Sequence, residues 1–168
     1  LNSTSDGFIK GIEEENKRSR FKFEVEKFNA NADYGVGNSI ASRLISGNYD
    51  YIATVSTLSA QIVSSVNKNI PHIFMAVTDP IKAKVVASFE NHPPYLTGLA
   101  SPQPVDVTIE LMGKVFPKAK TIGMIWNNSE VNSEICTQMA RQSAVKYNFK
   151  LIERTISSSS EIEEAFKS

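Results

Sequence analysis

Apolar runs of strand length, without polar alternation, are separated along this chain by segments with helical periodicity. Three such runs cover residues 51–55, 72–77 and 121–126. Strands that are apolar on both faces are typical of parallel sheets covered by helices on both sides. The sequence therefore predicts an α/β protein with a parallel sheet, in which residues 51–55 and 72–77 form neighbouring, almost wholly buried strands.

Further elements follow from periodicity and from helix-ending residues. Two further strands are predicted, a short one at residues 96–100 and another at 149–156. Apolar residues at helical spacing predict helices at 36–47, 58–66 and 108–116, then from 131 onward and after the serine run 157–160; Gly47 and Pro117 mark two of the helix ends. Residues 21–28 alternate Phe21, Phe23 and Val25 with charged residues, which predicts a half-exposed strand at a sheet edge.

The charge balance and the scarce Cys and His residues exclude several kinds of protein. Lys plus Arg and Asp plus Glu number 18 each, so there is no net basic charge for nucleic acid and no polybasic membrane anchor. The single cysteine, Cys136, excludes an intramolecular disulfide and a multi-cysteine metal site. His72 and His92 lack a carboxylate cluster, so neither a metal nor a cofactor is predicted.

Polar residues follow the strands where they end, which is where open α/β sheets bind ligands. Ser56 and Thr57 lie between a predicted strand and the next helix, whose first N–H groups and positive dipole end suit a carboxylate. Alternatively, one of the two residues simply caps the helix. Thr78 and Asp79 end the next strand, and they could bind a carboxylate and an ammonium group, respectively. Alternatively, Asp79 binds its own backbone in a turn before Pro80.

The loop after the strand 121–126 supplies the remaining candidate ligand-binding residues, which are Asn127, Asn128, Glu130 and Asn132. Amide side chains both donate and accept, so they can bind the polar groups of an amino acid. The alternative is a solvated loop that begins a helix. Trp126, at the strand end, is a candidate for stacking on a ligand.

Four motifs in order resemble the substrate-binding proteins of bacterial ABC transporters, in particular the tryptophan/tyrosine-type group. They are Val77-Thr78-Asp79-Pro80, Leu96-Thr97-Gly98-Leu99, the segment 117–123, and Asn127-Asn128-Ser129-Glu130-Val131-Asn132-Ser133. The resemblance covers essentially the whole chain. Asn128 stands where this family usually has proline.

The resemblance implies a type I periplasmic-binding-protein fold, with two flavodoxin-like lobes, a hinge and a ligand held in the cleft. Residues 1–101 would be the first lobe without its first strand, and residues 102–168 the hinge and the beginning of the second lobe. We therefore expect the chain to be part of a longer protein. The Ser101-Pro102-Gln103-Pro104 segment is the candidate boundary.

The function that the resemblance implies is solute binding without catalysis. The protein would lie outside the cytoplasm, in the periplasm or as a membrane-anchored lipoprotein, and deliver a small polar or zwitterionic ligand, such as an amino acid, to the membrane subunits of an ABC permease. The alternative is the ligand-sensing domain of a transcriptional or signalling regulator. A two-cysteine racemase is excluded because Cys136 is alone, and neither histidine follows a strand as a hydrolase triad requires.

Overall fold

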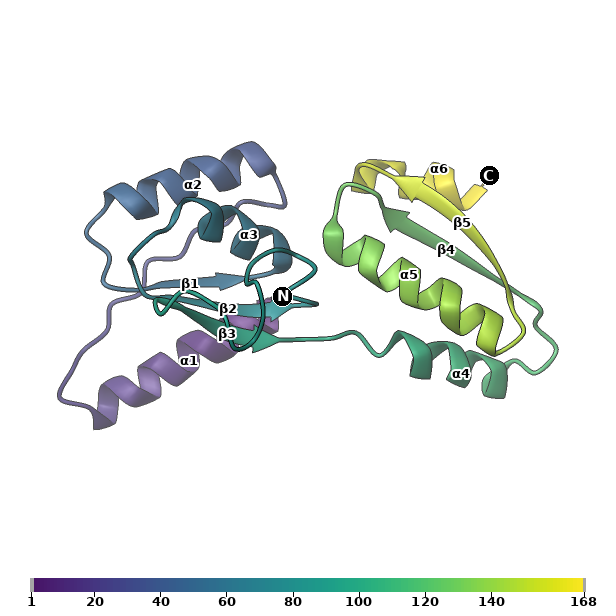
Figure 1. Cartoon of the computed structure of the whole chain (residues 1–168), viewed down its shortest axis with the longest axis horizontal. Coiled ribbons are helices and arrows are strands. Elements are labelled where there is room, and N and C mark those ends of the chain that lie inside the picture. Colours follow the sequence, from purple (N-terminus) through teal and green to yellow (C-terminus); the bar gives the residue numbers. More distant parts are fainter. Residues whose placement is uncertain (1, 168) are drawn as a thin grey trace. The chain divides into compact units, whose positions relative to one another are not determined.

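The computed structural model describes residues 2–167, which divide into two compact units between Ser101 and Pro102. Both units are mixed α/β structures whose strands run parallel. The predicted fold class is thereby confirmed. Each unit is described by itself below, with the element labels of Figure 1.

The first unit contains a three-stranded parallel sheet in the order β1 (Ile52–Val55), β2 (His72–Val77), β3 (Leu96–Ala100). The predicted pairing of the first two strands is confirmed, with Ile52 level with His72. Helices α2 (Tyr34–Ser46) and α3 (Thr57–Val66) pack on one another, and α3 also contacts β1 and β2. Figure 1 draws both helices on the same side of the sheet.

Only one face of this sheet is well buried. Ile52, on that face, forms a core cluster with Ala41 of α2 and with Ile62 and Val63 of α3. On the opposite face Ala53 is exposed, and Leu99 is 69% exposed. The prediction that both strands are almost wholly buried is therefore wrong for β1. The physical reason is that α1 (Asn2–Arg18) buries none of its residues, so it does not seal the second face.

The predicted strand at residues 21–28 is also wrong, because the segment has no regular secondary structure. Phe21 is 59% and Val25 49% exposed. A strand requires a neighbour for its backbone hydrogen bonds, and among the described residues β1 pairs on one side only, with β2. The segment is instead held by side chains, because Glu26 accepts hydrogen bonds from Arg43 and from the Tyr49 hydroxyl.

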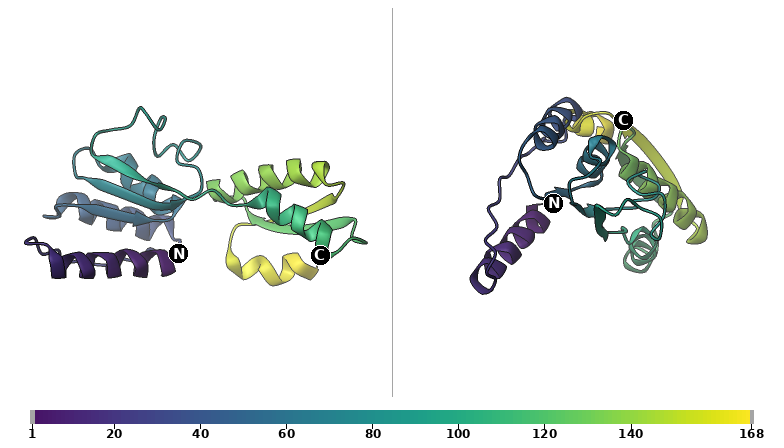
Figure 2. Two further views of the ribbon diagram at one scale, coloured as in Figure 1. Left: turned by 90° about the horizontal axis from the view of Figure 1, so that it is seen from below. Right: turned by 60° about the vertical axis from the view of Figure 1, so that its left-hand side comes forward.

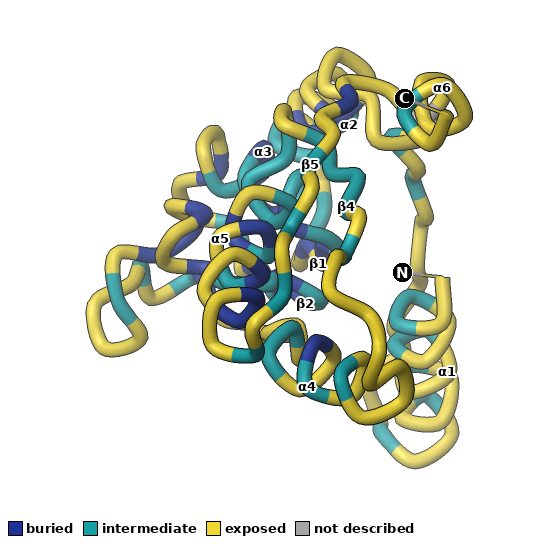
Figure 3. The backbone as a smooth tube through the Cα atoms, turned by 90° about the vertical axis from the view of Figure 1, so that its right-hand side faces the viewer, coloured by how far each residue is buried: buried dark blue, intermediate teal, exposed yellow. Residues whose placement is uncertain are grey.

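The second unit is built on a pair of parallel strands, β4 (Thr121–Asn127) and β5 (Lys150–Ile156). Its helices are α4 (Val105–Val115), α5 (Val131–Lys146) and α6 (Ile162–Lys167), with a 3₁₀ turn at Ser159–Glu161. The left view of Figure 2 shows the strands between α5 on one side and α6 on the other. Parts of α5 are dark blue in Figure 3, which marks buried residues. The buried residues of α5 include Ile135 and Ala140. In the part of the chain that the structure describes, no helix is both long and apolar enough to cross a membrane.

A carboxylate joins α4 to α5 in this unit. Asp106 accepts hydrogen bonds from Lys146 Nζ at 2.8 Å, Ser143 Oγ at 2.9 Å and the Tyr147 hydroxyl at 3.1 Å. The Lys146 ammonium, assisted by the hydroxyls, lowers the pKa of Asp106. An apolar cavity of about 360 Å³ lies beside α4, and its lining includes Cys136, whose thiol pKa is raised by burial.

Gly98 in β3 tests how closely β2 and β3 pack in the first unit. Gly123 in β4 of the second unit is the control, because it also lies in a strand but has open space beside it. A Cβ atom on Gly98 would overlap the carbonyl oxygen and ring of Phe74, whereas one on Gly123 would meet nothing within 4 Å. We expect Gly98→Ala to lower the free energy of unfolding by about 1–3 kcal/mol. Gly123→Ala should leave it unchanged or raise it by up to about 1 kcal/mol. Urea unfolding of both variants measures the difference. Equal stabilities would contradict the close contact between Gly98 and Phe74.

Candidate functional site

The carboxyl ends of the three strands of the first unit lie side by side. Ser56, which follows β1, donates its backbone N–H to Met75 O of β2 at 3.1 Å. Ser101, which follows β3, donates its backbone N–H to Val77 O at 2.7 Å. Thr78 follows Val77 directly. Parallel pairing therefore brings the polar residues beyond each strand to one edge of the sheet.

The backbone is strained where β1 and β2 end. Ser56 has φ 108° and ψ 156°, a region that is adopted essentially only by glycine. In β2, Ala76 has φ 54°, and the register with β3 shifts between Phe74 and Val77. Strain of this kind is characteristic of ligand-binding and switch segments. Ser56 directly precedes Thr57, and Ala76 lies two residues before Thr78.

The side chains of Ser56 and Asp79 are used in local structure. Ser56 Oγ accepts the Ser59 N–H at 3.3 Å and so caps α3. Asp79 Oδ1 accepts the backbone N–H groups of Ile81 at 3.1 Å and Lys82 at 2.9 Å. Ser56 therefore caps the helix and Asp79 binds the backbone of its own turn, as the alternative interpretations of these two residues predicted.

The hydroxyls of Thr57 and Thr78 differ from these two, because neither has a hydrogen-bond partner among residues 2–167. Thr57 is the first residue of α3 and is 4% exposed, and Thr78 is half-buried at the end of β2. The N–H groups of Thr57 and Leu58 belong to the first turn of α3, where a helix offers them no acceptor. The strand ends thus present unpaired donors at the positive end of a helix dipole, an arrangement that suits an anionic group.

In the second unit, three of the four predicted loop residues are joined by hydrogen bonds. Glu130 accepts from the side-chain amides of Asn127 and Asn132, at 3.2 Å in both cases. Asn127 Oδ1 also accepts from the N–H and hydroxyl of Ser129. Asn128 is exposed, and only its backbone N–H is bonded, to Ile156 O at 3.1 Å. The structure therefore brings Asn127, Glu130 and Asn132 together and leaves Asn128 outside the cluster.

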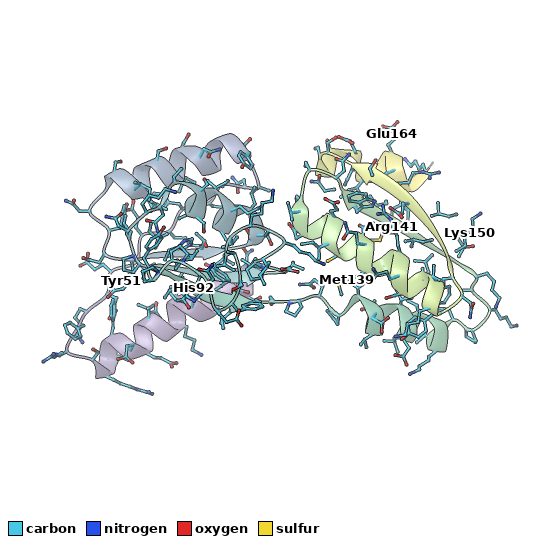
Figure 4. All side chains as sticks on the ribbon, in the orientation of Figure 1. Tyr51, His92, Met139, Arg141, Lys150 and Glu164 are labelled. Carbon is cyan, nitrogen blue, oxygen red and sulfur yellow. The ribbon has the colours of Figure 1, made fainter. Side chains whose placement is uncertain are left out.

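Trp126 belongs to a separate cluster on the same unit. Its indole N–H donates to Glu153 at 3.1 Å, and Glu153 also accepts two hydrogen bonds of 2.7 Å from Arg141. The Arg141 guanidinium, labelled in Figure 4, lies 5.8 Å from the centre of the Trp126 ring. These contacts join β4, β5 and α5, so Trp126 has a structural role there.

One further polar residue lies at a strand end of the first unit, Ser101, which was not among the predicted residues. Its signal in the sequence is its position directly after the strand at 96–100. A hollow of about 600 Å³ in the first unit is lined by Ile81 and by residues 84–87 and 91–93, and none of the predicted ligand-binding residues lines it. No group of three or more metal-ligating side chains occurs within residues 2–167.

The strain at Ser56 can be measured separately from its role as a helix cap. Ser56→Ala removes the cap and keeps a Cβ in the strained backbone, so we expect it to lower the free energy of unfolding by about 1 kcal/mol. Ser56→Gly also removes the side chain but relieves the strain, so it should be at least as stable as wild type. Thermal unfolding of the two variants tests this. If Ser56→Gly were less stable than Ser56→Ala, the backbone at residue 56 would not be strained.

Comparisons with known proteins agree on one family. The family model described as ABC transporter substrate binding protein matches residues 1–168. A tyrosine-binding protein from Clostridioides difficile strain R20291 is 38% identical over all 168 residues, which are 49% of its own length. The chain thus spans about half the length of this relative.

Solved structures that are similar to this chain agree with the family match. A conserved domain protein from Vibrio cholerae O1 biovar El Tor matches 98% of the chain with a TM-score of 0.89 and 29% identity, over 55% of its own length. An ABC domain from Streptococcus pneumoniae in complex with L-Trp matches 93% of the chain with a TM-score of 0.84 and 26% identity, over 54% of its own length. Its fold, its strand-end motifs and its match to the family model over every residue show that this chain belongs to the ABC transporter substrate-binding proteins, a family of binding proteins and not of enzymes.

Proposed function

We propose that the chain is part of a protein that binds an aromatic amino acid, such as tyrosine or tryptophan, and delivers it to the membrane subunits of an ABC permease. The ligands named for the two relatives support this choice, since one is a tyrosine-binding protein and the other contains L-Trp. The protein would work outside the cytoplasm, in the periplasm or as a membrane-anchored lipoprotein. Residues 1–101 would be its first lobe, and residues 102–168 the hinge and the beginning of its second lobe.

The observation that carries the proposal is the set of unpaired donors at the start of α3. An amino acid presents a carboxylate, which needs several donors and a positive potential. The hydroxyls of Thr57 and Thr78 have no partner within residues 2–167, and the first N–H groups of α3 point toward its N-terminus. The carboxylate would accept from these groups, while Ser56 and Asp79 hold the backbone around them.

The loop cluster of the second unit is proposed as a ligand-binding group in its own right. Glu130 contributes a half-buried carboxylate, which would form a charge-assisted hydrogen bond with an ammonium group. The amides of Asn127 and Asn132 fix its orientation, at 3.2 Å each. Asn128 would contribute through its exposed side chain.

Binding of L-tyrosine and L-tryptophan, measured by titration calorimetry, tests the carboxylate site. Thr57→Val and Thr78→Val keep the shape of each side chain and remove its hydroxyl. Because a hydrogen bond to a neutral group is worth about 1 kcal/mol and one to a charged group more, we expect each variant to bind about fivefold or more weakly.

The matched control is Thr97→Val, because Thr97 is an exposed threonine of β3 that lies before the strand end. This variant should bind as wild type does. If all three variants bound equally well and were folded, the strand-end carboxylate site would be wrong.

A further inference from the structure

His72 is the first residue of β2, the middle strand of the first-unit sheet, and its side chain is only 1% exposed. It lies level with Ile52 of β1 and Leu96 of β3. Its Nε2 is 2.8 Å from the hydroxyl oxygen of Thr54, which is itself buried in β1. The imidazole therefore provides a buried side-chain link between two strands whose backbones are paired.

The other ring nitrogen of His72, Nδ1, is buried and has no partner among the described residues. A neutral imidazole with its hydrogen on Nε2 donates to Thr54 and leaves only a lone pair on Nδ1. A protonated imidazole carries hydrogens on both nitrogens, so one buried N–H would have no acceptor. An unsatisfied buried donor and a buried charge are both costly.

Among the described residues, no neighbouring charge offsets this cost. The elements with the most extensive contacts to β2, which are β1, β3 and α3, contain no titratable residue. The titratable residues of the segment between β2 and β3 are Asp79, Lys82, Lys84, Glu90, His92 and Tyr95. None of them perturbs the imidazole, because burial alone lowers the pKa of His72 from 6.5 to about 4.

We propose that His72 is an acid-sensitive lock: its neutral ring holds β1 and β2 together, and protonation opens this part of the sheet. The same two strands lead into Thr57 and Thr78 at their carboxyl ends, so opening would also disrupt the candidate carboxylate site. This second consequence rests on the proposed function, whereas the lock itself does not.

The direction of the effect follows from the lowered pKa. Well above pH 6.5 the ring is neutral in both the closed and the open form, so the lock is fully effective. As the pH falls from 6.5 toward 4, only the open form takes up a proton, and opening becomes more favourable. With these two pKa values, the opening equilibrium constant should be about 20-fold larger at pH 5 than at pH 7.

Hydrogen exchange of the backbone amides of β1 and β2, corrected for intrinsic rates, measures this equilibrium at pH 7 and pH 5. His72→Gln keeps a side-chain N–H for Thr54 and cannot be protonated, so it should lose most of the pH dependence. His92→Gln is the matched control, since His92 is exposed and is labelled in Figure 4. His92→Gln and wild type should both show the increase, and an equal increase in His72→Gln would overturn the proposal.

If His72→Gln does not fold, the protonation state of His72 in the wild-type protein tests the proposal instead. The ring resonances of His72 in the wild-type protein should stay in the neutral position down to pH 5 while the first unit remains folded. A ring that becomes protonated near its ordinary pKa in the folded protein would overturn the lock. Calorimetry of the full-length protein with L-tyrosine and L-tryptophan at the same two pH values tests the proposed function separately. Absence of binding at pH 7 would contradict the proposed function, whereas the exchange data alone decide the lock.

Discussion

The parallel hydrogen bonding of β1 and β2 is the interaction on which the rest of the first unit depends. Parallel strands place all their carboxyl ends at one edge of a sheet, so the residues that follow them must gather there. The bond from Ser56 N–H to Met75 O continues the ladder by one step beyond β1. It fixes the start of α3 against the end of β2, where the unpaired hydroxyls of Thr57 and Thr78 are found.

This arrangement is held at a cost in backbone strain. Ser56 occupies a region of φ and ψ that favours glycine, and its side chain caps α3. The cap and the continued ladder offset the strain, since each satisfies a backbone N–H that would otherwise lack a partner. These two hydrogen bonds hold the donors of the strand end in position, and donors positioned in advance lose little conformational entropy when an anion binds.

The burial of the sheet explains which of its polar residues are structural. On the face covered by α3, Thr54 and His72 satisfy one another, and the cost of the unpaired Nδ1 is tolerable only while the ring is neutral. On the opposite face α1 buries no residue, which leaves Ala53 and Leu99 exposed. The pair of strands β1 and β2 thus contributes both to a core that is sensitive to protonation of His72 and to a polar edge that suits a ligand.

The sequence by itself determined the order and type of most of the elements, the direction of the strands and the position of polar residues after each strand. These features depend on local periodicity and on residues such as Gly47 and Pro117, which act within a few positions of the chain. The tertiary structure alone decided that residues 21–28 form no strand, that Ser56 and Asp79 are used in capping and turn formation while the two threonine hydroxyls are not, and that Trp126 binds Glu153. Each of these outcomes depends on which donors, acceptors and neighbouring strands come within reach once the chain has folded, and hydrophobic periodicity does not encode those pairings.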